Sequence, residues 1–324
     1  MSASLLFIFV LLYFGLLLAV AKITAKNSNN MSFFIGNKNS HWMLVAFGMI
    51  GTSLSGVTFV SVPGAVGKDA FHYLQITLGY LIGYITIGYV LLPIYYKLNL
   101  TSIYHYLEQR MGFNAYKTGA SFFVLSRTLG ATARLYLVVK ILQVFILDSL
   151  QVPFWVTTLV ILIMILLYTY EGGVKTIVWT DTLQTSGMLL GLIICSVYIL
   201  SHLHLSVTEG WQAMQAKGLA TIFNTDVNSK SFFLKQIIGG AFITLTMTGL
   251  DQEMMQKNIS VKTLKDAQKN MVTIGFTMLL VISLFLFLGG LLHLYAAQNN
   301  ITATGDDLFP TICLLYTSPS PRDQ

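Results

Sequence analysis

The residues best suited to chemistry are small and hydroxyl side chains in the middle of one long apolar stretch, 41–64. They read Gly48-Met49-Ile50-Gly51-Thr52-Ser53-Leu54-Ser55-Gly56, with Thr58 just beyond. Such a run weakens a helix, and at membrane depth each freed backbone group costs on the order of several kcal/mol. A broken helix persists there only where it lines a cavity, and its carbonyl oxygens can coordinate a cation. Close helix–helix contact through small residues is the alternative.

A second stretch, 232–250, repeats this combination of residues. It holds Gly239-Gly240, Thr244, Thr246, Thr248 and Gly249, and Asp251-Gln252 and Gln256-Lys257 follow it. Because the threonines alternate, they form no single helical stripe, and a plain helix with scattered hydroxyls is the alternative. A second interrupted helix five spans after the first is what an inverted repeat of five plus five helices requires.

A carboxylate also enters the apolar part of the chain. Asp181 follows the turn at Gly172-Gly173 and begins the apolar span 178–202 about one helical turn deep. It either attracts a cation that leaves a midplane site or is a helix N-terminal charge favoured by the macrodipole.

Composition identifies the class of protein that must position these residues. Of 324 residues, 55% are hydrophobic and 10% are charged, which excludes an ordinary soluble domain. A span needs about 20 apolar residues. We predict an all-α, polytopic membrane protein with eight spans, at 3–21, 41–62, 70–97, 118–148, 153–170, 178–202, 232–250 and 271–296.

Basic residues set the predicted orientation. The net charge of +6 comes mostly from residues in loops, which favours lipid headgroups over nucleic acid as the partner. With the N-terminus outside, three or four lysines lie in external loops: Lys68, Lys217 and Lys230, with Lys235 near a boundary. Eleven basic residues then lie in cytoplasmic loops: Lys22, Lys26, Lys38, Lys97, Arg110, Lys117, Lys175, Lys257, Lys262, Lys265 and Lys269.

The fourth span carries three basic residues of its own, Arg127, Arg134 and Lys140. Arg127 and Arg134 are seven residues apart and share a helix face. They either line a watery, bundle-facing stripe or extend to the interface from a long tilted helix.

Two other functional classes have weaker support. A membrane-embedded enzyme needs a catalytic cluster at one depth, and the close pair His202 and His204 has only Glu209 as a nearby acid. A channel needs rings of like residues and no second broken helix.

Several of these motifs together resemble the sodium:solute symporter family. They are the run 48–64 with Pro63, the segment 106–110, the turn 172–184, and the segment 249–260 with Asp251-Gln252 and Gln256-Lys257. The resemblance covers essentially all of 1–312. It implies the LeuT-type fold, with one helix before two inverted five-helix repeats, and sodium-coupled symport of a small organic solute across the cell membrane.

The resemblance also implies roles for individual residues. Gly51 and Leu54 would offer carbonyls to the coupled sodium ion, Ser53 would be an oxygen ligand or lie beside it, and Asp181 would lie on the cytoplasmic sodium route. Thr58, Gln75, Thr244 and Met247 match substrate-contacting positions. Met247 stands in place of a gating tyrosine, which argues against a sugar. The family's other sodium ligands, two hydroxyl residues on core helix eight, fall beyond this sequence.

The tail 313–324 differs in character from the rest of the chain and holds two of the six prolines. Its residues back-translate plausibly into a transposon-end adapter of sequencing libraries. We interpret it as a fusion scar and treat 1–312 as part of the transmembrane domain.

The charge bias generates a topology prediction. We expect a cysteine at position 262 (Lys262→Cys) to react with an impermeant thiol reagent only from the cytoplasmic side. The same reagent should label Lys217→Cys only from outside. The opposite labelling pattern in intact cells would reverse the orientation.

Overall fold

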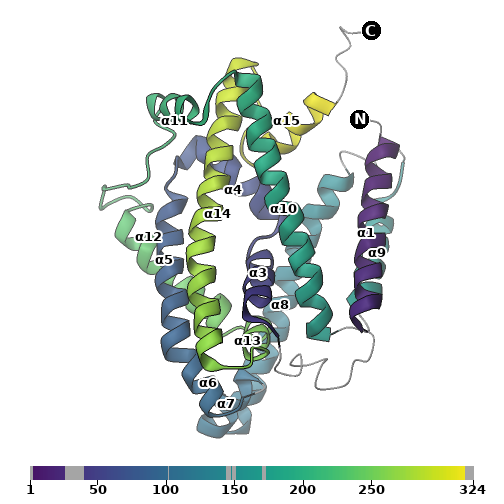
Figure 1. Ribbon diagram of the computed structural model, residues 1–324, viewed down its shortest axis with the longest axis vertical. Helices are drawn as coiled ribbons and strands as arrows, with labels where there is room; N and C mark the ends of the chain where they lie inside the picture. The colour runs from purple at the N-terminus through teal and green to yellow at the C-terminus, as the bar shows by residue number, and fades with distance from the viewer. Residues whose placement is uncertain are drawn as a thin grey trace.

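The computed structural model describes residues 3–25, 40–100, 102–143, 147, 151–169 and 173–317, and within them it shows helices packed around one central helix (Figure 1). In the first half they are α1 (Ala3–Ala25), α3 (Trp42–Ser53), α4 (Gly56–Asp69), α5 (Tyr73–Thr86), the π-helix η2 (Ile87–Leu91), α6 (Leu92–Lys97), α7 (Ile103–Met111), α8 (Phe113–Leu142) and α9 (Phe154–Thr169). The second half has α10 (Gly173–Leu203), α11 (Val207–Ala216), α12 (Phe233–Thr244), the π-helix η5 (Leu245–Gly249), α13 (Gln252–Ile259), α14 (Leu264–Gln298), the 3-10 turn η6 (Gly305–Asp307) and α15 (Leu308–Thr317).

Each predicted span coincides with a helix or a helix pair. Four helical segments are long and apolar enough to cross a membrane, and six if each of two bent pairs counts as one span. Two shorter apolar helices, 8–23 and 154–167, match the remaining predictions. The bent pairs are α3 with α4, at 60°, and α12–η5 with α13, at 69°. Both predicted helix breaks are therefore present.

Some segments predicted as loops are helical. The segment 106–110 belongs to α7, and the long polar connection 203–231 contains α11. Ser206 caps α11, because its hydroxyl oxygen accepts the Glu209 N–H at 3.3 Å. Its own N–H and hydroxyl each donate to the Glu209 carboxylate at 2.7 Å, and these bonds lower the pKa of that exposed group. Gly172 of the predicted turn and residues 318–324 of the tail lie outside the described residues.

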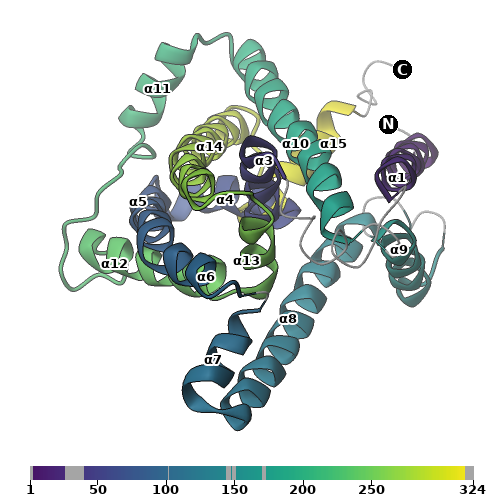
Figure 2. The same ribbon diagram turned by 60° about the horizontal axis from the view of Figure 1, so that its bottom comes forward.

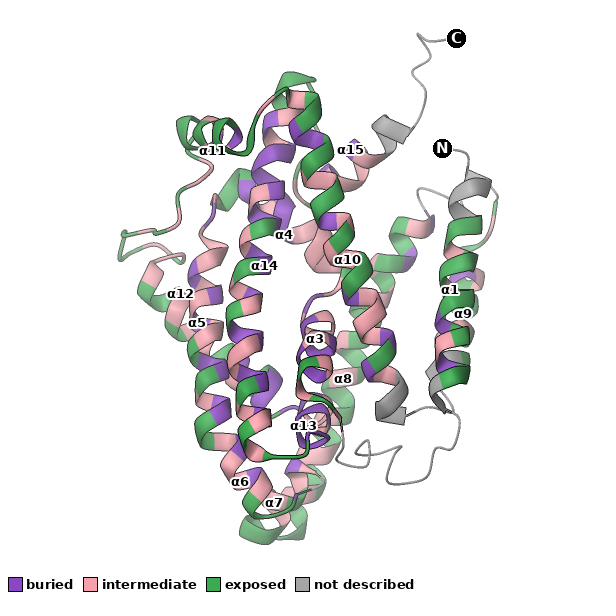
Figure 3. Ribbon diagram, in the orientation of Figure 1, coloured by how far each residue is buried: buried purple, intermediate pink, exposed green. Residues whose placement is uncertain are grey.

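The core of the protein forms around α14, which contacts α3, α4, α5 and α10. Figure 2 shows α1 and α9 at the outside of the bundle, away from α14. The side chains of α14 are buried along most of its length, whereas α1, α8, α9 and α10 carry many exposed apolar side chains (Figure 3). Phe285 is fully buried and packs edge-on to Phe59 of α4, with ring centroids 5.1 Å apart. At Gly289, a Cβ would lie 2.6 Å from the Pro63 carbonyl oxygen, so α4 and α14 meet through a residue without a side chain.

The contact between α5 and α12 also depends on glycines. A Cβ at Gly240 would collide with the Ile76 carbonyl oxygen, and one at Gly79 with the Ile237 carbonyl oxygen. These glycines let the first half of the second broken helix lie directly on α5. Backbones that approach this closely are typical of helix packing in membranes.

Paired alanine substitutions test this packing. We expect Gly240→Ala to destabilise the protein by about 1–3 kcal/mol, because the methyl group overpacks the α5–α12 contact. A Cβ at Gly239 has open space around it, so Gly239→Ala should be neutral or stabilise α12 by up to about 1 kcal/mol through helix propensity. Thermal unfolding in detergent measures both. Equal effects of the two variants would show that the contact is not tight.

Candidate functional site

The first break lies at Leu54 and Ser55, between α3 and α4. Both residues have extended backbones, with φ −94° and ψ 121° at Leu54 and φ −107° and ψ 170° at Ser55. The Ser55 N–H donates to Thr58 Oγ1 at 3.1 Å and makes no bond to the Gly51 carbonyl four residues earlier. Among the described residues, the Gly51 and Leu54 carbonyls accept no hydrogen bond, so both oxygens are available to a cation.

Gly51 has a packing role as well. A Cβ there would collide with Thr185 Oγ1 of α10 and lie 3.1 Å from the Asp181 carbonyl oxygen. The glycine therefore brings α3 against α10. The sequence allowed two interpretations of this run, a helix break and a close contact between helices. Both are present: the break is at Leu54 and Ser55, and the close contact is at Gly51.

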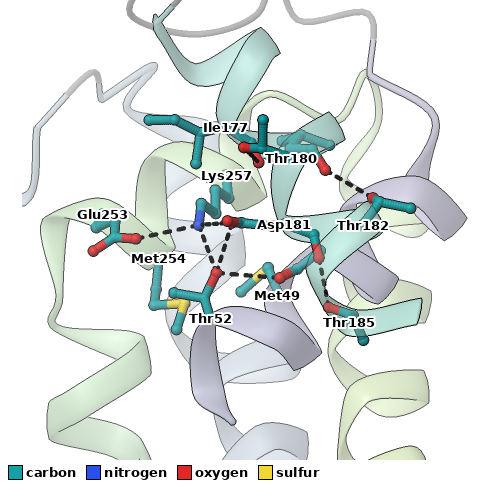
Figure 4. Close-up of polar contacts among 12 residues, drawn as sticks. Met49, Thr52, Ile177, Thr180, Asp181, Thr182, Thr185, Glu253, Met254 and Lys257 are labelled. Atoms are coloured by element: carbon teal, nitrogen blue, oxygen red, sulfur yellow. Dashed lines mark hydrogen bonds and ion pairs between the residues drawn. The ribbon is translucent and has the colours of Figure 1, made fainter. Parts of the chain in front are cut away.

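Asp181 lies at the centre of a polar cluster that joins three helices (Figure 4). Its Oδ2 accepts from Thr52 Oγ1 of α3 at 2.9 Å and from Lys257 Nζ of α13 at 2.7 Å. Lys257 Nζ also donates to Thr52 Oγ1 at 2.7 Å and to Glu253 Oε1 at 3.2 Å. The Lys257 side chain is only 3% exposed.

This buried position of Lys257 differs from the prediction from the sequence, which places the residue in a cytoplasmic loop. It lies instead on α13, the second half of the broken helix, and faces inward. Its position after Asp251-Gln252 and Gln256 within the second motif was the available signal. Thr52, which is not among the predicted site residues, lies in the first glycine and hydroxyl run.

The second break begins after the π-helix η5. Asp251 caps α13 by accepting the Met254 N–H at 3.0 Å, and its other oxygen pairs with Arg127 of α8. Tyr95 donates its hydroxyl to the Gly249 carbonyl at 2.6 Å. Side chains from α6 and α8 thus satisfy polar groups at this break, as a helix end inside a membrane requires.

Between the breaks lies a cavity of about 240 Å³. Five of the eight predicted site residues line it: Ser53, Leu54, Thr58, Thr244 and Met247. Both arginines of the fourth span also line it, which supports the bundle-facing reading of that stripe. Lys140 lines a different pocket, beside Asp306 and Asp307.

Gln75, Gly51 and Asp181 are not among the residues that line this cavity. Gln75 is fully buried and engaged with a connecting loop: its Nε2 donates to the Ser231 carbonyl at 3.4 Å, and its Oε1 accepts the Asn224 N–H at 3.3 Å. In this conformation it holds the segment 224–231 against α5. Its predicted contact with a solute stays a prediction.

The described residues contain no group of three histidine, cysteine or acidic side chains that could hold a metal ion. His202 and His204 near the end of α10 therefore form no such group with Glu209. The oxygens around the first break are carbonyls and hydroxyls, which suit an alkali cation better than a transition metal.

Comparison with known proteins agrees with this geometry. The sodium/iodide cotransporter of Homo sapiens is 27% identical over 257 residues, which cover 78% of this chain and 39% of that protein. A sodium/sialic acid symporter of Aliivibrio fischeri is 24% identical, over 89% of this chain and 57% of that protein. The chain thus spans roughly two fifths to three fifths of the length of these relatives.

A solved structure has the same fold. It is a substrate-bound, outward-open Na⁺-coupled sialic acid symporter, which matches with a TM-score of 0.83 and 20% identity over 95% of this chain and 64% of that one. This likeness confirms the LeuT-type architecture of a polytopic membrane protein. The profile of the sodium:solute symporter family matches residues 33–308, and the chain belongs to that family.

Proposed function

We propose that the protein to which this chain belongs is a sodium-coupled symporter of a small organic solute, working by alternating access in the cell membrane. One observation carries the proposal: a broken helix presents two carbonyls, of Gly51 and Leu54, that accept no hydrogen bond from the described residues, beside a cavity between two discontinuous helices. Discontinuous helices of this kind bind coupling ions and solutes in secondary transporters. Membership of a symporter family also argues against the two alternatives, a channel and a membrane-embedded enzyme.

Sodium in this proposal is a transported partner and not a resident cofactor. The Gly51 and Leu54 carbonyls and the Ser53 hydroxyl would bind it, and hard oxygen donors suit such an ion. Asp181 lies next to these three sodium ligands but does not line the cavity. This fits a position on the route that sodium takes rather than a place among the ligands themselves. The Lys257 ammonium lies 2.7 Å from the Asp181 carboxylate and would compete with a passing sodium ion for that carboxylate.

The solute would occupy the cavity itself. Thr58, Thr244 and Met247 line it and are the contacts that we propose, with Gln75 as a further contact in another conformation of the transport cycle.

We also propose the orientation with the N-terminus outside, in which the break between α12 and α13 faces the cytoplasmic half of the bilayer.

The coupling is energetically adequate. A membrane potential of about 100 mV supplies roughly 2.3 kcal/mol per charge. A tenfold sodium gradient adds about 1.4 kcal/mol. Their sum supports an accumulation of a neutral solute on the order of several hundredfold per ion.

Ser53 tests the sodium site. In the full-length protein, we expect Ser53→Ala to raise the half-saturating sodium concentration for uptake by about tenfold, because one oxygen near the cation is lost. The solute KM at saturating sodium should change much less. Ser196→Ala is the control, since that hydroxyl donates to the Leu192 carbonyl of its own helix, α10, at 2.8 Å. An unchanged sodium dependence in Ser53→Ala would contradict the assignment. Gly51→Leu is unsuitable, because its side chain would collide with Thr185.

Lys257 tests the polar cluster. We expect Lys257→Met to destabilise the protein by about 3–5 kcal/mol, because it leaves the Asp181 carboxylate, which is only 17% exposed, without its cation. Adding Asp181→Asn should restore much of the loss, since neither charge then remains unpaired. Thermal unfolding of single and double variants in detergent measures this coupling. Lys262→Met, at an exposed lysine, is the control. Strictly additive losses would show that the pair is not coupled.

A further inference from the structure

An apolar groove of about 690 Å³ lies on the surface of the helix bundle, between α10, α11 and α14. Leu192 and Leu200 of α10 and Phe287 of α14 line it. Ile193 and Val197 lie at its edge and are 54% and 60% exposed, so the groove opens outward. It shares no lining residue with the cavity between the two helix breaks, and is therefore separate from the proposed place of the solute.

The two hydroxyl groups in the body of the groove are engaged within their own helices. Ser196 Oγ donates to the Leu192 carbonyl at 2.8 Å, and Ser283 Oγ donates to the Leu279 carbonyl at 2.7 Å. Neither proton is then available to a ligand, and the side chains around the two serines are apolar. Because ordered water needs several polar partners, a hydrocarbon chain suits this part of the groove better.

One end of the groove, formed by α11, is polar. Thr208, Gln212 and Gln215 line it there, and their spacing of four and three residues puts these exposed side chains on one face of α11. Trp211 lines the same end and packs edge-on against Phe71, with ring centroids 5.7 Å apart. Tryptophan is enriched at the boundary between membrane and water, so this end has the character of the headgroup region.

Close packing holds α11 in this place, and Figure 1 shows it beside the upper part of α14. A Cβ at Gly290 of α14 would collide with Met214 Sδ of α11. A Cβ at Gly210 of α11 would lie 3.2 Å from Leu200 Cδ2 of α10. The polar end of the groove is therefore a fixed part of the fold.

The groove has the length of one leaflet of a bilayer. It runs along α10 from Leu192 toward the end of that helix at Leu203, a distance of about 16 Å at a rise of 1.5 Å per residue. Residues 177–203 of α10 are long and apolar enough to cross a membrane. Half of a hydrocarbon core of about 30 Å is about 15 Å, so the apolar body matches the depth of the acyl chains.

We propose that this groove binds one phospholipid from the leaflet on the side of α11. One acyl chain lies along α10 and α14, and the glycerol ester and phosphate groups lie at Gln212 and Gln215, whose amides can donate hydrogen bonds to them. A groove that faces lipid and stays empty forfeits dispersion contacts along its walls, whereas a flexible hydrocarbon chain restores them.

Photochemical labelling tests the site in the full-length protein. The probe is phosphatidylcholine with a diazirine in one acyl chain, diluted into phosphatidylcholine nanodiscs. We expect labelling to concentrate on the groove, at Val197 and Leu284, above the level at Leu280. Leu280 is the matched reference, because it lies on α14, is 61% exposed and does not line the groove. Equal labelling of the three positions would overturn the proposal.

Retention of phospholipid in detergent, measured by native mass spectrometry, gives a second test. We expect one phospholipid to stay bound to the unmodified protein. Val197→Trp should reduce its retention about tenfold, because the indole fills the groove. Leu284→Trp fills the groove from α14 and should do the same. Leu190→Trp is the control, since Leu190 lies on α10, is 59% exposed and is not in the groove.

The polar end is tested by replacing both glutamines. We expect Gln212→Leu with Gln215→Leu to weaken retention about tenfold, because two hydrogen bonds to the headgroup are lost. Unchanged retention in this double variant would contradict the placement of the headgroup and with it the proposal.

Other results would also overturn the proposal. They are the absence of a retained phospholipid, full retention in both tryptophan variants, and cross-links from the groove to another protein segment or to a second copy of the chain. Unfolding temperatures show which variants keep the fold, and Leu284→Trp keeps the test valid if Val197→Trp does not fold.

Discussion

A polypeptide backbone that leaves its helix inside a bilayer has no water to bond with, and this requirement governs both breaks in the chain. At the first break, the Thr58 hydroxyl takes the Ser55 N–H, which leaves the Gly51 carbonyl without its helical donor. At the second, Asp251 accepts the Met254 N–H, and Tyr95 donates to the Gly249 carbonyl. Side chains close the breaks incompletely, and the oxygens that remain are the proposed cation ligands.

The two breaks are also tied to each other. Lys257 on the second broken helix bonds to Thr52 on the first and to Asp181 on α10 (Figure 4). These three residues come from distant parts of the chain, and each belongs to a different helix. If the two halves of the fold move relative to one another during transport, as alternating access requires, this cluster must rearrange. A sodium ion near Asp181 would weaken the hold of the lysine and so couple ion passage to movement.

Close packing supplies the frame in which such a rearrangement occurs. Gly240 and Gly79 let α12 lie on α5, Gly289 lets α4 lie on α14, and Gly51 lets α3 lie on α10. In lipid the hydrophobic effect does not drive helices together, so contact area gained through small residues has to stabilise the bundle. The exposed apolar faces of α1, α8, α9 and α10 suit lipid or further protein.

The sequence by itself determined the helices, because hydrophobic length and the distribution of glycine and hydroxyl residues are local properties. It located helices at all eight predicted spans, of which up to six are long and apolar enough to cross a membrane, and it located both breaks. The family profile confirmed the class that its motifs resemble. It also identified Ser53, Leu54, Thr58, Thr244 and Met247, which the structure brings together around one cavity.

Only the tertiary structure decided which side chains bond to one another. Lys257, which we predicted in a loop, is buried against Asp181. Gln75 bonds to the connection 224–231, and its predicted contact with a solute stays a prediction. Likewise, Arg127 and Arg134 share a helix face, but only one of them meets a carboxylate among the described residues. Pairings of this kind depend on residues far apart in the chain, and no local pattern encodes which of two similar side chains will find its counter-charge.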